Sequence, residues 1–249
     1  MAELTKEEKQ ILEKYRLCLH EISPNVMVKG SELLKEDQLI RLFNEDLQIK
    51  YNTDKHQVLG SMLLKSYAFL GALVLYSMSI FNKGINSSIE NLSLYTKEDD
   101  PFWLPSFRFT NMEVTTPASN RNEWRDEVLG ALFKQNIARM ITTISKISRV
   151  AKVILWENVA VYIFWMYEST LEDPDLAEET KARIQDDFLY VVFEAAPHLF
   201  GVKAKNPLTP FLNEKQNNVR KRSTCCLFYL TSKNNDRCST CPIECKSPN

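Results

Sequence analysis

Histidine and glycine are scarce in this chain of 249 residues, which contains three histidines and six glycines. His20, His56 and His198 do not stand beside a cysteine, which disfavours a Rieske-type cluster, where two histidines replace two cysteine ligands. The isolated glycines form neither the G-x-G-x-x-G pattern of dinucleotide-binding folds nor the G-x-x-x-x-G-K-S/T loop that binds nucleotide phosphates. The sequence therefore gives no sign that the chain itself binds a nucleotide cofactor.

An excess of charge of one sign is also absent, because 31 lysines and arginines face 32 aspartates and glutamates, for a net charge of −1. This balance does not favour nucleic acid as a partner. Residues 1–9 are charged and lack the apolar segment of a signal peptide, so we expect a cytoplasmic protein. In a reducing cytosol, clustered cysteines bind metals or do redox work more often than they form disulfides.

Cysteine, by contrast, is concentrated at the end of the chain. Five of the six cysteines lie in the last 25 residues, and Cys18 is most simply a buried small hydrophobic residue. The adjacent pair Cys225 and Cys226 is followed, after eleven residues, by the C-x2-C pair Cys238 and Cys241. Four thiols in such a short segment make a metal site the first hypothesis.

The spacing favours one kind of metal site without excluding others. Structural zinc usually takes its ligands as two C-x2-4-C pairs, and adjacent cysteines reach a single ion only if the backbone bends, because neighbouring side chains point apart. A binuclear iron–sulfur cluster is larger and accepts ligands from more divergent directions. Spacing alone thus favours an iron–sulfur cluster and leaves structural zinc and redox-active or free thiols open. Cys245 is interpreted as a free thiol that could replace a failed ligand.

Two segments resemble a known family. The run 222–229, Arg-Ser-Thr-Cys-Cys-Leu-Phe-Tyr, together with Cys238-x2-Cys241-Pro, closely resembles the end of the FhuF-type ferric-siderophore reductases, in which C-C-x10-C-x2-C holds a [2Fe–2S] cluster. Residues 155–160, Leu-Trp-Glu-Asn-Val-Ala, resemble a Trp-x-Asn segment of that family more loosely. The chain departs from the pattern by one extra residue between the cysteine pairs, and the polar loop 231–236 is a place where an insertion is tolerated. The resemblance implies a [2Fe–2S] cluster with four ligands (Cys225, Cys226, Cys238 and Cys241) and two supporting residues (Trp156 and Asn158).

The pattern of apolar residues predicts a mainly α (α+β) fold. Helices are expected over residues 4–20, where Thr5 begins a capping box, and over 31–51, 54–82, from Asn120 onwards and over 147–171, with a further helix beginning at Asp173 and Pro174. Alternating apolar residues within 85–116 predict a small antiparallel hairpin or sheet. We therefore expect a helical body at 1–215, with a small β element near 86–116, and a C-terminal cluster-binding segment at 216–249.

The expected helix 54–82 has an apolar centre. A membrane span needs about 20 apolar residues, and Lys65 and Lys83 bracket only seventeen. We interpret it as a core helix, and the family resemblance leaves a peripheral membrane contact open. Glu157 and Asn158 stand in another very apolar run, where buried polar groups need partners. They are interpreted either as an internal hydrogen-bonded pair or as a support for the cluster or substrate.

The resemblance implies a ferric-siderophore reductase, which adds one electron to a hydroxamate, catecholate or citrate complex of Fe(III). Hard oxygen donors hold the resulting Fe(II) less tightly, so the metal is released. A ferredoxin-like protein or an NAD(P)H-linked reductase would supply the electron. The alternative is a non-catalytic siderophore-binding or scaffold protein with a structural zinc or cysteine site. The helical body would bind the siderophore, and candidate contacts are the basic residues Arg108, Arg139, Lys146, Arg149, Lys221 and Arg222.

Overall fold

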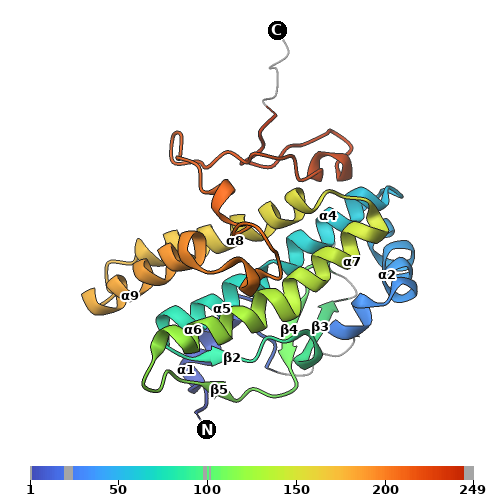
Figure 1. Ribbon diagram of the computed structural model, residues 1–249. Coiled ribbons are helices and arrows are strands. Elements are labelled where there is room, and N and C mark those ends of the chain that lie inside the picture. Colours follow the sequence, from blue (N-terminus) through green and yellow to red (C-terminus); the bar gives the residue numbers. More distant parts are fainter. Residues whose placement is uncertain (1, 20–24, 98–99, 101, 244–249) are drawn as a thin grey trace.

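The computed structural model describes residues 2–19, 25–97, 100 and 102–243. Helices make up 57% of the chain, and small antiparallel sheets accompany them, which confirms the predicted mainly α class. The longer helices form one packed bundle, and the C-terminal segment crosses it on one side, over α8 and α4 (Figure 1). The α-helices are α1 Lys6–Glu13, α2 Glu36–Leu42, α3 Gln48–Tyr51, α4 His56–Tyr67, α5 Phe69–Ile80, α6 Arg121–Leu129, α7 Ala138–Ser148, α8 Lys152–Leu171 and α9 Glu178–Leu189.

Shorter helical turns continue or connect these helices. Three π-helical stretches extend α-helices: η2 Phe43–Leu47, η4 Gly130–Ile137 and η5 Tyr190–Glu194. The 3-10 turns are η1 Gly30–Leu34, η3 Ile89–Asn91, η6 Pro197–Phe200, η7 Thr209–Phe211 and η8 Phe228–Thr231. The last of these lies in the cysteine segment and packs against α4.

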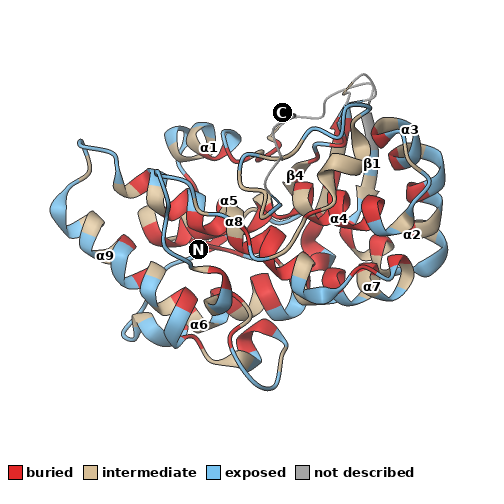
Figure 2. Cartoon of the chain, turned by 90° about the horizontal axis from the view of Figure 1, so that it is seen from above, coloured by how far each residue is buried: buried red, intermediate tan, exposed pale blue. Residues whose placement is uncertain are grey.

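Helices α4, α5 and α8 form the centre of the core. Helix α5 packs against α8 and α9, while α4 packs against α7 and α8. Figure 2 shows that buried residues run along α4, α5 and α8. The contact between α4 and α7 is unusually close at Gly60, because a Cβ atom there would lie 2.5 Å from Ser148 Oγ. Glycine at this position therefore allows two backbones to approach and places the neighbouring Ser61 deep in the bundle.

In the part of the chain that the structure describes, one helical stretch, His56–Ile80, is long and apolar enough to cross a membrane. However, 89% of its most apolar window is buried inside the protein. It corresponds to α4 and α5, whose residues contact the surrounding helices on nearly all sides. This burial agrees with the interpretation of the stretch as a core helix.

The predicted β element is a three-stranded antiparallel sheet with the order β1-β3-β4. Its strands are β1 Asn25–Lys29, β3 Leu92–Lys97 and β4 Ser106–Phe109, and Leu94 pairs with Phe107. Along β3 and β4, buried residues alternate with more exposed ones, as the alternating apolar residues in the sequence predicted. A second pair, β2 Gly84–Ile85 and β5 Val114–Thr115, flanks the sheet. Strand β1 was not foreseen, because a five-residue strand carries little signal until its distant partner is known.

Helix boundaries differ from the sequence predictions in three places. The first helix ends at Glu13, well before residue 20. Arg149 takes a left-handed conformation (φ 59°) and ends α7, so α8 begins at Lys152 rather than near residue 147. The helix predicted to start at Asp173 begins only at Glu178, because the Asp173 carboxylate accepts a hydrogen bond from the Asp175 amide (3.0 Å) and closes a turn instead.

Candidate metal centre

The cysteine segment, residues 222–241, lies across the ends of α4 and α8 and is mostly irregular (Figure 1). Such a segment has few backbone hydrogen bonds of its own, so its position depends on contacts with the helices beneath it. Two consecutive buried polar residues of α8, Glu157 and Asn158, are 1% and 0% exposed. Both make those contacts.

Glu157 binds the backbone just before the first cysteine pair. Its two carboxylate oxygens accept hydrogen bonds from the amide N–H of Ser223 (2.5 Å) and of Thr224 (2.8 Å), and the Thr224 hydroxyl donates a further one. Arg222 Nη2 lies 3.5 Å from the same carboxylate, and both side chains are 2% exposed. The buried negative charge is therefore balanced by an equally buried positive charge and by three donors.

Asn158 links this segment to α4. Its carbonyl oxygen accepts a hydrogen bond from Arg222 Nη2 (2.6 Å), and its amide nitrogen donates to the carbonyl oxygen and the hydroxyl of Ser61. The Ser61 hydroxyl in turn donates to the carbonyl oxygen of Cys226 at 2.8 Å. A continuous buried network thus connects α8, α4 and the backbone of the first cysteine pair.

The two cysteine pairs are brought together by the backbone. The Arg222 amide donates to the carbonyl oxygen of Thr240 (2.9 Å), which joins the backbone before the first pair to the loop of the second. Cys226 Sγ and Cys238 Sγ lie 3.7 Å apart. Two thiolates bound to one metal ion at about 2.3 Å with tetrahedral angles lie about 3.8 Å apart. This pair therefore already has the separation of two ligands of the same metal ion.

Cys225 and Cys241 flank this pair. Leu227 has a left-handed backbone (φ 66°), which is uncommon for a branched residue, and its amide donates to Cys225 Sγ at 3.4 Å. This left-handed residue turns the chain directly after the adjacent cysteines. Within the described residues, no group of three or more Cys, His, Asp or Glu side chains converges into a complete metal site. Cys245 lies outside the described residues.

The surroundings of Cys226 favour its thiolate form. The Cys238 thiol donates a hydrogen bond that lowers the pKa of Cys226 to about 5, and the nearby positive charges of Lys65 and Arg222 also lower it. The same interaction raises the pKa of Cys238, and burial raises it further. Burial raises the pKa of Cys225. Since the thiolate is the form that binds metals, Cys226 is prepared as a ligand before any metal arrives.

Two family models match the chain in succession. The model described as ferric iron reductase FhuF-like transporter matches residues 64–219, and the model described as FhuF 2Fe-2S C-terminal domain matches residues 222–242. The chain belongs to the FhuF family. A search of curated proteins finds no match to the sequence. Membership supports a ferric iron reductase-like function and identifies the cofactor of this FhuF-like protein as a [2Fe–2S] cluster.

The donor set of this chain fits that cofactor. The range matched by the 2Fe-2S domain contains four cysteines and no histidine, which is the all-thiolate set that plant-type [2Fe–2S] clusters use. One pair of those thiols, Cys226 and Cys238, is already at ligand separation. The alternative of structural zinc loses its support, because the matched domain is an iron–sulfur domain.

The remaining predicted site residues do not form one group. Arg222 and Asn158 meet, whereas Trp156 packs its ring against Phe133 and Phe200. Of the predicted basic contacts, Arg108 lies in β4, Arg149 and Lys221 are exposed, Arg139 pairs with Glu90 and Lys146 pairs with Glu36. Neither of these ion pairs involves the cysteine segment.

Two residues of α4 that serve the site were not predicted from the sequence. Ser61 holds the Cys226 carbonyl, and Lys65, one turn later on the same helix, lies over the Phe228 ring (4.8 Å to the ring centroid) and near Cys226. Ser61 and Lys65 stand four residues apart in an apolar run, which places them on one face of the helix. That spacing was the available signal, but nothing in the sequence shows that this face meets a segment far along the chain.

Proposed function

We propose that this FhuF-like protein is a cytoplasmic ferric-siderophore reductase, which transfers one electron to Fe(III) in a siderophore and so releases Fe(II). The observation that carries the proposal is the uninterrupted succession of the two family matches, a ferric reductase body followed by a 2Fe-2S domain, in a chain that has the four thiols in place. The reaction balances as Fe(III)-siderophore plus one electron giving Fe(II) and the free siderophore. Hard oxygen donors hold Fe(II) far less tightly.

The four cysteines of the matched range, Cys225, Cys226, Cys238 and Cys241, are the ligands in this proposal. The [2Fe–2S] cluster supplies single electrons when bound. Residues 1–215 would form the siderophore-binding body, and residues 216–249 the cluster segment. Support for this division comes from the irregular segment, which is held on the helices by buried side chains of α4 and α8.

The residues around the cysteines have distinct roles in this proposal. Glu157 and Asn158 hold the backbone in place, and Arg222 anchors the segment from within, since its side chain is buried and fully engaged. Lys65 and Arg237 bring positive charge to the sulfurs, and Arg237 Nη1 lies 3.8 Å from Cys241 Sγ. Four thiolates, two sulfides and two ferric ions carry a charge of −2, which becomes −3 on reduction, so nearby cations stabilise the reduced form.

The first test is the composition and spectrum of anaerobically purified protein. The protein should be reddish-brown, contain about two iron and about two acid-labile sulfide per chain, and give a paramagnetic signal only after reduction. Colourless protein with one zinc per chain would contradict the proposal.

The second test separates a reductase from a mere binder. Dithionite-reduced protein, freed of excess dithionite, is mixed with a ferric siderophore under argon. A reductase should bleach the ligand-to-metal band of the siderophore while its own cluster spectrum returns to the oxidised form, with one Fe(II) formed per electron. If both spectra stay unchanged although the siderophore binds, the chain is a siderophore-binding protein.

The electron donor and any surface contact are further parts of the proposal. A ferredoxin-like protein or an NAD(P)H-linked reductase would reduce the cluster, and a peripheral membrane contact is compatible with the family description as transporter-like. The near-neutral charge of the chain continues to disfavour nucleic acid as a partner.

A further inference from the structure

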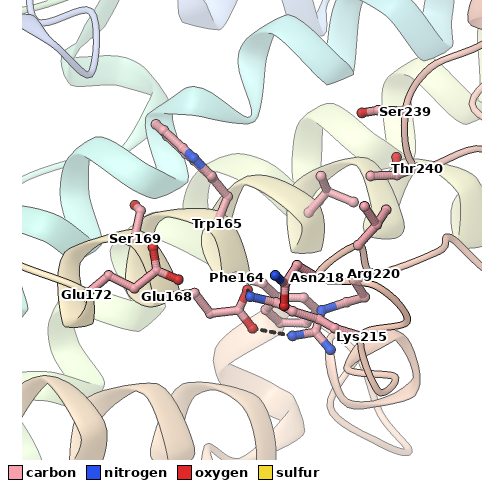
Figure 3. Close-up of a pocket in the computed structure, with 12 residues that line it drawn as sticks. Phe164, Trp165, Glu168, Ser169, Glu172, Lys215, Asn218, Arg220, Ser239 and Thr240 are labelled. Carbon is pink, nitrogen blue, oxygen red and sulfur yellow. Dashed lines mark hydrogen bonds and ion pairs between the residues drawn. The ribbon is translucent and has the colours of Figure 1, made fainter.

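A cleft of about 360 Å³ lies between α8 and the C-terminal segment. Its lining includes Phe164, Trp165 and Glu168 of α8 and Ser239 and Thr240 of the cysteine segment, and the Trp165 ring extends from α8 towards α5 (Figure 3). Ser239 and Thr240 are the residues that separate Cys238 from Cys241. Consecutive Cα atoms are about 3.8 Å apart, so a molecule that touches Ser239 and Thr240 lies within about two residue lengths of both cysteines.

The wall on α8 has an aromatic side chain that is open to solvent. Trp165 is 47% exposed, whereas Trp103, Trp124 and Trp156 are 2%, 5% and 6% exposed. An exposed indole at the mouth of a concave site is a typical platform for a flat or apolar part of a ligand. Phe164, which is 2% exposed, lies behind the lining, and its ring centroid is 5.6 Å from the guanidinium carbon of Arg220. The cleft therefore combines an aromatic face with charged groups at one end.

The charged end of the cleft is internally balanced. Glu168 accepts from Lys215 Nζ (2.9 Å) and also pairs with Arg220. Glu172 is the fourth charged residue of the lining, so the formal charges sum to zero. An anionic chelate thus gains no net attraction from the lining itself, and recognition depends on the aromatic wall and on hydrogen bonds.

We propose that this cleft is the site where the ferric chelate docks, with Trp165 lying against the organic part of the ligand and Ser239 and Thr240 bringing it next to the cysteine loop. This inference rests on the proposed function, which it deepens by placing the substrate. The cleft is concave and small, and a protein partner would need about 1,000 Å² of buried surface. A small ligand therefore fits it better than a protein donor.

The main test measures binding without electron transfer. The probe is the uncharged gallium(III) complex of a trihydroxamate chelator, since gallium(III) mimics the ferric complex but does not accept the electron. Titration calorimetry with the oxidised, cluster-containing protein gives its Kd. Trp165→Ala should weaken binding about tenfold, because it removes the aromatic platform. Trp165→Phe should restore part of the affinity. The matched control is Phe193→Ala, which removes an exposed aromatic ring (51% exposed) outside the cleft and should leave Kd unchanged.

A second variant tests the charged end. Glu168→Gln leaves Lys215 and Arg220 without their carboxylate and gives the lining a net charge of +1. At low salt, the affinity for a trianionic gallium(III) tricatecholate should rise relative to the uncharged probe by about fivefold to tenfold. Far-UV circular dichroism and the cluster absorption show that each variant is folded and loaded.

The outcomes separate this inference from the function on which it rests. If Trp165→Ala and Glu168→Gln bind both probes as the natural protein does, the cleft is not the docking site, whatever the protein reduces. If the natural protein reduces ferric chelates and these variants do so with unchanged KM, the reductase proposal stands and the cleft assignment falls. If the natural protein neither binds nor reduces any chelate, both fail.

Discussion

Glu157 offers the sharpest test of how the helical body controls the cluster segment. Glu157→Ala removes the acceptor of the Ser223 and Thr224 amides and leaves Arg222 as a buried cation without its carboxylate. Breaking one side of a buried ion pair usually costs about 3–5 kcal/mol. Because 1.4 kcal/mol is a tenfold change, the docked form of the segment should become roughly 100-fold to 4,000-fold less populated relative to an undocked form.

This cost should fall on the cluster rather than on the fold. Glu157 contacts residues 222–224 of the cysteine segment, whereas α4, α5 and α8 pack against one another and against α7 and α9 through other residues. The assay is the rate at which a strong iron chelator removes iron from the oxidised protein, followed by the loss of visible absorption. Glu157→Ala should lose its cluster much faster, or fail to assemble it, while the helical signal in far-UV circular dichroism and its melting midpoint change little.

Two further variants make the test quantitative. Glu157→Gln keeps the shape and one acceptor oxygen but loses the charge, so its loss rate should lie between those of the natural protein and Glu157→Ala. Glu36→Ala, which removes a carboxylate from an exposed ion pair with Lys146, should behave as the natural protein does. If Glu157→Ala keeps its cluster as firmly as Glu36→Ala does, the network does not hold the cysteine segment.

Three other substitutions test different parts of the structure. Gly60→Ala places a Cβ atom 2.5 Å from Ser148 Oγ, so the α4–α7 contact should loosen. The free energy of unfolding, measured by urea titration, should fall by about 1–3 kcal/mol. An unchanged midpoint of the urea titration would contradict the close approach. Asp187→Asn leaves the buried Arg125 and the partly exposed Arg121 without their shared carboxylate. Unfolding should therefore become easier by about 3–5 kcal/mol, and a loss below 1 kcal/mol in the same titration would refute this reasoning. Lys65→Ala removes a cation near the sulfurs and should lower the reduction potential of the cluster by roughly 30–60 mV in a potentiometric titration. Lys65→Arg, which keeps the charge, is the control. An unchanged potential in Lys65→Ala would show that this charge does not act on the cluster.

Local signals in the sequence were reliable where the structure depends on neighbours along the chain. The Thr5 capping box and the Asn120 cap both form, because their hydrogen bonds need only the next three residues. The predicted start of α9 at Asp173 was wrong for a related reason, since Asp-Pro-Asp is compatible both with a helix start and with the turn that forms there. A local sequence pattern that is compatible with two backbone conformations does not decide between them, because the packing around it does.

The sequence predicted the mainly α class from its apolar pattern, and it predicted the family and the iron–sulfur cofactor from the resemblance of one short cysteine segment. The spacing of the cysteines alone left zinc open. Only the tertiary structure decided what surrounds those cysteines. Ser61, Glu157 and Cys226 are far apart in the chain, and the cleft beside Ser239 exists only where the segment folds back over α8. Contacts of this kind depend on how helices pack, and side-chain packing is a property of the whole fold that no local pattern of residues records.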